Sequence, residues 1–98
     1  MQYNFEWDSV KERSNRQKHK LSFRQAATVF QDPNHISLYD EDHSQTEDRW
    51  ITLGMDRSGI LRVVIHTFEP VGSNQCDIRI ISARTATKAE AQQYQETQ

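Results

Sequence analysis

The feature that most constrains the fold of this 98-residue chain is a pair of apolar runs separated by a four-residue turn. The first run spans residues 50–55 and the second spans residues 60–68, while Asp56 and Gly59 begin and end the turn. Both runs are short and rich in residues that favour strands, and the turn ends in glycine, so together they predict an antiparallel β-hairpin. The rest of the chain must complete a sheet around this hairpin.

The N-terminal part of the chain predicts one strand followed by a polar helix. Aromatic and polar residues alternate from Tyr3 to Trp7, which is the pattern of a half-buried strand. Asp8 then has the position and chemistry of an N-cap, and it opens a predicted helix over roughly residues 9–19. Because this helix is almost entirely polar, neighbouring elements must hold it in place. Its expected core contacts are Val10, Gln17 and Leu21.

A second helix is predicted to begin after Ser22. Ser22 and Gln25 have the spacing of a capping box, which marks the start of a helix. Apolar side chains then recur at helical spacing, so this helix is expected to be amphipathic. They are Phe23, Ala26, Ala27 and Phe30. The helix is expected to end at Asp32-Pro33, because proline pushes the residue before it out of the helical conformation.

The remaining segments complete a predicted β-α-α-β-β-β-β-α order. They are a short strand at residues 36–39, an exposed acidic connection at 40–48, a loop at 69–75, a strand over about 76–83 and a C-terminal helix. A second capping box, made by Thr87 and Glu90, opens that helix. We therefore expect one α+β domain over residues 1–98, in which two N-terminal helices and the C-terminal helix pack on one face of an antiparallel sheet.

The composition excludes several classes of protein. The longest apolar run, residues 63–65, is far too short to span a membrane or to serve as a secretion signal, so we expect a cytoplasmic protein. The single cysteine, Cys76, cannot form an internal disulfide or a thiol framework for zinc, and is expected to be a half-buried strand residue. The three glycines lack the spacing of a phosphate-binding loop, so no nucleotide cofactor is expected.

Charge is strongly segregated along the chain, although the formal net charge is only −2. Residues 1–31 contain six basic and three acidic groups, whereas residues 32–48 contain six acidic and no basic groups. Residues 49–98 contain six basic and five acidic groups. Such segregation creates local potentials that the net charge conceals, so a nucleic-acid partner remains open.

Six residues form a basic constellation that suits RNA cleavage without a metal. They are Lys18, His19, Glu47, Arg49, His66 and Arg84. Such cleavage needs a base for the 2′-hydroxyl proton, an acid for the leaving 5′-oxygen and cations for the charged phosphorane. Histidine titrates near neutral pH, and the arginine fork matches a phosphate group.

Each member of this constellation also has a structural interpretation. Lys18 and His19 would stabilise a helix dipole at a C-terminus, and Glu47 with Arg49 would form a surface ion pair. His66 would be a packed strand residue. A metal-dependent hydrolase is a further alternative, because carboxylates beside imidazole bind divalent ions. Its ligands would be Asp40, Asp42, His43 and His66.

Four groups of residues occur in an order that resembles a known family. They are Phe5-Glu6-Trp7-Asp8 with Lys11, Asn15 and Lys18-His19; Leu21-Ser22-Phe23 with Ala26-Ala27 and Val29-Phe30; Asp42-His43-Ser44 with Glu47-Asp48-Arg49-Trp50 and Leu53-Gly54; and Val63-Val64-Ile65 with Thr67 and Arg79-Ile80-Ile81-Ser82-Ala83-Arg84-Thr85-Ala86-Thr87 with Glu90. The matches cover about residues 3–94 and resemble the BrnT family, the toxin halves of bacterial type II toxin–antitoxin systems.

The resemblance implies a ribonuclease toxin with a RelE-like α+β fold that inhibits translation. It implies neutralisation by a BrnA-like ribbon-helix-helix antitoxin, in a dimer or heterotetramer that contacts operator DNA only through the antitoxin. No metal or other cofactor is implied. The site residues carried over by the resemblance are Lys18, His19, Glu47, Arg49 and Arg84, with His66 added.

Two features depart from the family pattern. Lys20 stands where glycine often follows the Lys-His pair, so the first helix is expected to lack its usual left-handed cap. The loop at residues 69–75 is also longer than the short turn common in the family. An alternative function, compatible with the near-neutral net charge and the mostly polar first helix, is a non-catalytic, toxin-like module that binds an antitoxin and contributes to operon repression.

Overall fold

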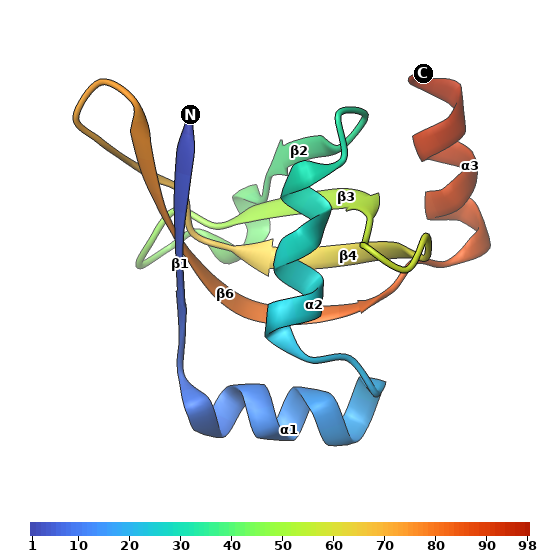
Figure 1. Ribbon diagram of the computed structural model, residues 1–98, viewed down its shortest axis with the longest axis horizontal. Coiled ribbons are helices and arrows are strands. Elements are labelled where there is room, and N and C mark those ends of the chain that lie inside the picture. The colour runs from blue at the N-terminus through green and yellow to red at the C-terminus, as the bar shows by residue number, and fades with distance from the viewer.

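The computed structural model describes all residues from 1 to 98, and it has a mixed α+β fold (Figure 1). In chain order the elements are β1 (Gln2–Trp7), α1 (Ser9–His19), α2 (Phe23–Ala27), the 3-10 helix η1 (Thr28–Gln31), β2 (Ile36–Tyr39), the 3-10 helix η2 (Glu41–His43), β3 (Trp50–Met55), β4 (Leu61–His66), β5 (Glu69–Val71), β6 (Gln75–Thr85) and α3 (Lys88–Glu96). None of the helices combines the length and the apolar character needed to cross a membrane.

The strands form one six-stranded sheet in the order β1-β6-β4-β3-β2, with β5 paired to β6 off this path. The predicted β3–β4 hairpin is confirmed, with Trp50 opposite His66 and Met55 opposite Leu61. The expectation of a wholly antiparallel sheet is wrong, because β1 runs parallel to β6. The alternation that predicts β1 is the same for either direction of pairing, so it could not distinguish them.

The prediction of a loop over residues 69–75 is also wrong in part. Its first part is β5, which pairs antiparallel with β6 through Glu69, Pro70 and Val71. Gly72 then adopts a positive φ of 69° in the turn. Pro70 argued for a loop, but proline is tolerated on an edge strand, where its missing N–H breaks no ladder.

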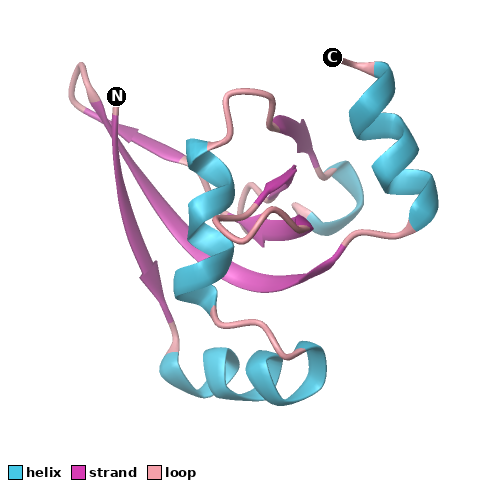
Figure 2. Cartoon of the chain, turned by 45° about the vertical axis from the view of Figure 1, so that its right-hand side comes forward, coloured by secondary structure: helices cyan, strands magenta, loops and turns pink.

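One face of the sheet carries the larger core, which is covered by α2 and η1 (Figures 1 and 2). Phe23 and Val29 are fully buried there, and they belong to the same cluster as Val64 of β4 and Ile78 of β6. Cys76 lies in this cluster with no exposed surface, so the expectation of a half-buried thiol is wrong. The amphipathic pattern of α2 thus predicted its buried side correctly.

The opposite face of the sheet carries a smaller core, which α3 helps to cover. Tyr94 of α3 packs with Leu53 of β3 and Val63 of β4. Those two side chains alternate with the ones that face α2, because successive strand residues point to opposite faces. The expectation that all helices lie on one face is therefore wrong. The predicted capping box of Thr87 and Glu90 at the start of α3 is confirmed.

Helix α1 is held by a polar residue rather than by apolar contacts. Its expected core residues Val10 and Gln17 are exposed, whereas Asn15 is buried. The Asn15 side chain donates to the carbonyl oxygen of Ala83 at 2.9 Å and accepts from the N–H of the same residue at 3.1 Å. Strand β1 ends opposite Ile80, so Asn15 supplies the hydrogen bonds that a continuing strand would have given to β6.

The end of α1 differs from the expectation raised by Lys20. The helix does have a left-handed cap, because Lys20 itself adopts φ 56° and ψ 35°. Its N–H donates to the carbonyl oxygen of Arg16 at 2.9 Å. The left-handed conformation is therefore kept without glycine, at the steric cost that a side chain incurs there.

Candidate active site

The predicted site residues lie at three places around β6 and at one place in the core. Lys18 and His19 end α1, Glu47 and Arg49 precede β3, and Arg84 lies near the end of β6. His66 ends β4. The distances between these residues are determined by the fold and not by their separation along the chain.

Glu47 is the centre of a compact ionic cluster. One carboxylate oxygen accepts a hydrogen bond from the Arg79 guanidinium at 2.5 Å, and the other lies 3.6 Å from the Arg49 guanidinium. The hydrogen bond from Arg79 holds the pKa of the Glu47 carboxyl below its usual range. We call Glu47, Arg49 and Arg79 the Glu47 cluster. It combines an ionised carboxylate with two cations at the surface.

Two hollows meet at the Glu47 cluster. One, of about 420 Å³, is lined by Glu47 and Arg79 together with Lys11 of α1. The other, of about 360 Å³, also includes Glu47 and Arg79 and adds Phe68. The first hollow has two cations, Lys11 and Arg79, whereas four carboxylates line the second beside Arg79. A phosphate group could therefore approach Arg79 through the first hollow, where Lys11 lies beside it.

Arg84 is engaged by a second carboxylate. Its two terminal nitrogens donate to the two oxygens of Glu90 at 2.7 and 2.9 Å. This fork-to-fork pair raises the pKa of Arg84 and lowers that of Glu90 to about 2. Glu90 also accepts from the N–H of Thr87 at 2.8 Å, so the same carboxylate caps α3 and orients Arg84. The Arg84 side chain remains 41% exposed.

Lys18 and His19 make no side-chain hydrogen bond or ion pair. Lys18 is exposed and His19 is half-buried. His19 follows Asn15 by one helical turn on the same face of α1, and Asn15 is bonded to Ala83, the neighbour of Arg84. Lys18 and His19 are thereby placed near the β6 end that carries Arg84. Lys11, in the first part of α1, lies beside the Glu47 cluster instead.

The candidates therefore form two groups rather than one. Arg79 and Arg84 are five residues apart on β6, which corresponds to about 16 Å of strand. Lys11 and His19 are separated by about 12 Å of helix. The Glu47 cluster and the Arg84 region thus lie at successive positions along the same strand.

His66 is a core residue in this structure. Its side chain is 1% exposed, and its ring nitrogens contact the Thr52 hydroxyl at 2.6 Å and the Thr67 carbonyl oxygen at 2.8 Å. The ring also packs edge-on against Phe30, with centroids 4.9 Å apart. Burial lowers the pKa of His66 to about 4. These contacts favour the packed-strand interpretation, and a substrate has no access to the imidazole.

The residues considered as metal ligands are not gathered into one site. His43 lies 3.0 Å from a carboxylate oxygen of Asp40, while His66 is in the core. No group of three or more His, Cys, Asp or Glu side chains is arranged to hold a metal ion. The acidic connection instead folds locally into η2.

Arg79 is the member of the Glu47 cluster that was not among the predicted site residues. It lies between Ile78 and Ile80, which are both buried, so strand alternation placed its side chain on the opposite face. That alternation was visible in the sequence. Its pairing with Glu47, 32 residues earlier, was not.

A family model matches residues 7–90 and describes the ribonuclease toxin, BrnT, of a type II toxin–antitoxin system. The chain belongs to the BrnT family. This match confirms the resemblance found in the sequence. Membership of a type II toxin–antitoxin family also implies an antitoxin as partner.

A solved BrnT structure has a similar fold. The crystal structure of the Brucella abortus ribonuclease toxin BrnT matches with a TM-score of 0.58 and 26% sequence identity. The match covers 90% of the present chain and 100% of the Brucella chain. None of the curated proteins compared with the chain matches it. The mixed α+β fold described above is therefore similar to that of a BrnT toxin.

Proposed function

We propose that this BrnT-family chain is a metal-independent endoribonuclease that acts in the cytoplasm and inhibits translation. Its proposed inhibitor is a BrnA-type ribbon-helix-helix antitoxin, which would link the toxin to operator DNA in a dimer or heterotetramer. The observation that carries the proposal is the Glu47 cluster, where an ionised carboxylate and two arginines meet beside two open hollows. We further propose that the fold is RelE-like.

The proposed reaction begins when a base removes the proton from the 2′-hydroxyl group of RNA. The 2′-oxygen then attacks the adjacent phosphorus, the bond from phosphorus to the 5′-oxygen breaks, and an acid protonates that oxygen. Arginine side chains stabilise the charge that builds up on the phosphorus-bound oxygens. The reaction needs no electron transfer and no co-reactant.

The cluster geometry favours Glu47 as the base and Arg79 and Arg49 as the phosphate-binding groups. Hydrogen bonding to Arg79 keeps Glu47 ionised at neutral pH, a form that accepts a proton and cannot donate one. Arg84 lies further along β6, and Lys18 and His19 lie at the end of α1. We assign RNA binding to Arg84 and Lys18, and either RNA binding or the role of the acid to His19. His66 keeps a structural role in this proposal.

The test is RNA degradation by purified, antitoxin-free protein with and without a chelator. We expect cleavage that persists in the chelator, and we expect Glu47→Gln and Arg84→Ala each to reduce the rate at least tenfold. Lys88→Ala provides the matched control, because Lys88 is exposed on α3 and makes no ion pair. Loss of cleavage in the chelator would contradict metal independence, and equal rates for all four proteins would contradict these assignments.

The second candidate is the non-catalytic antitoxin-binding module. It is favoured by the ion pairs themselves, because Glu90 occupies the Arg84 fork and Glu47 occupies Arg79. Expression in cells separates the two candidates. Growth arrest that disappears with Glu47→Gln supports the ribonuclease, whereas normal growth together with intact binding of a ribbon-helix-helix antitoxin supports the module.

A further inference from the structure

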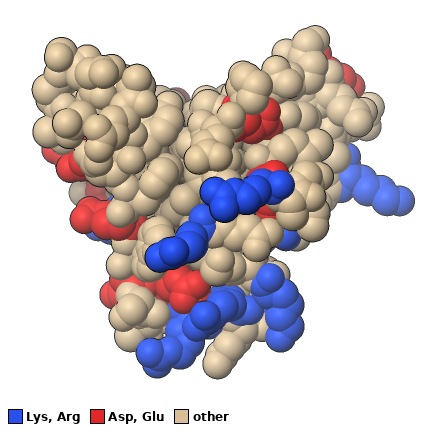
Figure 3. All heavy atoms as spheres, viewed as in Figure 1, with Lys and Arg blue, Asp and Glu red and all other residues tan.

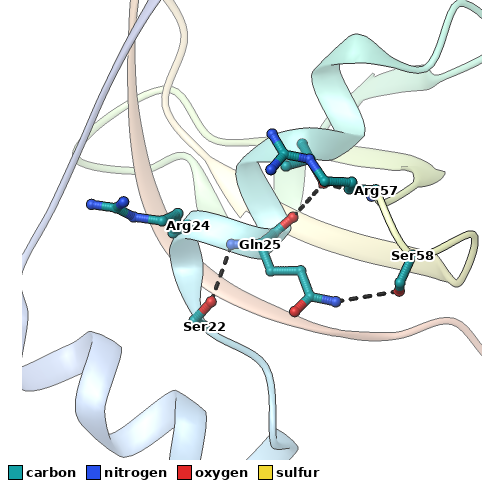
Figure 4. A pocket seen from close by; sticks show the side chains of 6 residues that line it. Ser22, Arg24, Gln25, Arg57 and Ser58 are labelled. Atoms are coloured by element: carbon teal, nitrogen blue, oxygen red, sulfur yellow. Dashed lines mark hydrogen bonds between the residues drawn. The ribbon is translucent and has the colours of Figure 1, made fainter.

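A separate polar hollow of about 640 Å³ lies between α2 and the turn that joins β3 to β4 (Figure 4). All six residues that line it are polar: Ser22, Arg24, Gln25, Thr28, Arg57 and Ser58. It opens on the side of the sheet that α2 covers. Arg79 and Arg84 project from the other side, because they alternate with the buried residues Ile78, Ile80 and Ala83.

The walls of this hollow are held together by hydrogen bonds between its two elements. The Gln25 side chain of α2 donates to Asp56 at 2.9 Å and to Ser58 at 3.3 Å, both in the turn. The N–H of Arg57 donates to the Thr28 hydroxyl at 2.8 Å. These hydrogen bonds fix the positions of the two segments that carry the arginines of the hollow.

Arg24 and Arg57 are the two cations of this hollow, and both are free to bind an anion. Neither guanidinium takes part in an ion pair or a side-chain hydrogen bond, and both residues are exposed. The neighbouring carboxylate, Asp56, has no exposed side-chain surface and is paired with Arg62 at 2.8 Å. Its negative charge is thus already matched. The planar guanidinium fork is well suited to phosphate oxygens.

An aromatic surface adjoins the two arginines. A smaller hollow of about 220 Å³ shares Arg24, Thr28 and Arg57 with the first one, and it adds Phe5 and Trp7 of β1. Both residues are half-buried, because Phe5 packs against Phe30 and Trp7 packs edge-on against Phe23. Figure 3 shows that lysine and arginine side chains gather on this side of the molecule over α1, over α2 and over the nearby turn. Cations beside partly exposed aromatic rings are features that bind unpaired nucleotides.

We propose that Arg24 and Arg57 form a phosphate-binding site for single-stranded RNA, with a neighbouring base against Trp7 and Phe5. The inference rests on the proposed function in one respect, since RNA is the substrate there. It adds a binding surface on the opposite side of the sheet from the Glu47 cluster. A single strand is favoured over a duplex because only unpaired bases can stack on the two rings.

The test is binding of a short 2′-O-methyl RNA, which lacks the nucleophile for cleavage, followed by fluorescence anisotropy at several salt concentrations. The full chain is compared with Arg24→Gln/Arg57→Gln and with the control Lys88→Gln. We expect the double variant to bind at least tenfold more weakly at low salt. We also expect its salt slope to fall by about 1.4, or about 0.7 for each phosphate that an arginine no longer neutralises.

Because neither guanidinium makes an ion pair or a hydrogen bond within the protein, the double variant should fold normally, and thermal unfolding verifies this. Binding equal to that of the Lys88→Gln control would overturn the site. A loss confined to a duplex DNA probe of equal charge would overturn the assignment to RNA. If wild type cuts no RNA but the double variant loses RNA binding, the ribonuclease proposal fails while this one stands. If wild type cuts RNA but the double variant binds RNA as well as the control does, this proposal fails while the ribonuclease proposal stands.

Trp7 provides a second readout. The chain contains two tryptophans, so Trp50→Phe leaves Trp7 as the single indole reporter. We expect RNA to quench Trp7 fluorescence in that background, and we expect the quenching to disappear when Arg24 and Arg57 are also replaced. Unchanged fluorescence at saturating RNA would overturn the placement of a base against Trp7.

Discussion

His66 is an imidazole whose environment suits the neutral form alone. It lies between Thr52, Thr67 and the ring of Phe30, and burial lowers its pKa to about 4. In the unfolded chain the same group has a pKa near 6.5. Between those two pH values His66 is protonated in the unfolded state and neutral in the folded state, so lowering the pH favours unfolding.

The stability contributed by neutral His66 should therefore be fully present above pH 6.5 and should be lost as the pH falls toward 4. We expect this group to account for a decrease of about 2 kcal/mol in the free energy of unfolding between pH 7 and pH 4.5. Urea unfolding at the two pH values measures it. His66→Gln should remove this part of the pH dependence, whereas His43→Gln, at an exposed histidine, should keep it. Equal pH dependence in wild type and His66→Gln would contradict the prediction.

Asn15 and Arg79 show which residue roles the sequence could not reveal. Asn15 looks like an ordinary polar residue on a polar helix, and its role depends on an unpaired stretch of β6 that is 68 residues away. Arg79 could be assigned to a face of its strand, but its partner Glu47 comes from the acidic connection. In both cases the decisive contact is long-range, and no local pattern encodes it.

At the scale of elements, the strands and helices were largely predictable because periodicity and capping are local. Helices α1 and α3 begin where Asp8 and Thr87 predict, and their N-cap hydrogen bonds are present. The direction of β1 was not predictable, because a parallel pairing with β6 depends on where the chain returns after all the other elements. Edge strand β5 was missed because Pro70 is also typical of loops.

The end of α1 allows a prediction about backbone strain. Lys20 has φ 56°, a conformation that costs an L-residue roughly 1–2 kcal/mol and costs glycine little. Lys20→Gly should therefore raise the free energy of unfolding by about 1 kcal/mol and raise Tm by several degrees. Gln17→Gly, in the ordinary helical part of α1, is the matched control and should lower stability by about 1 kcal/mol. A loss of stability in Lys20→Gly would show that the lysine side chain contributes more than the strain costs.

At the scale of the whole molecule, the sheet separates two groups of arginines, which the net charge of −2 conceals. Arg49, Arg79 and Arg84 are each paired with a carboxylate. Arg24 and Arg57, on the side covered by α2, have no such partner. The first surface therefore carries carboxylates as well as cations and is closer to neutral, whereas the second has a net positive charge. This difference agrees with the proposed cleavage on one side and the proposed strand binding on the other.

Two surfaces that share no contact should contribute independently to RNA binding. Groups more than about 7–10 Å apart without common partners usually have additive effects, within about 0.5 kcal/mol. We therefore expect Arg24→Gln/Arg57→Gln to weaken binding of the 2′-O-methyl RNA by the same factor, within about twofold, in wild type and in Arg84→Ala. Anisotropy titrations of the four proteins at one salt concentration measure the cycle. If the factor falls to one in the Arg84→Ala background, the arginines act as a single continuous site. The proposal that the two sides of the sheet bind RNA independently is then wrong.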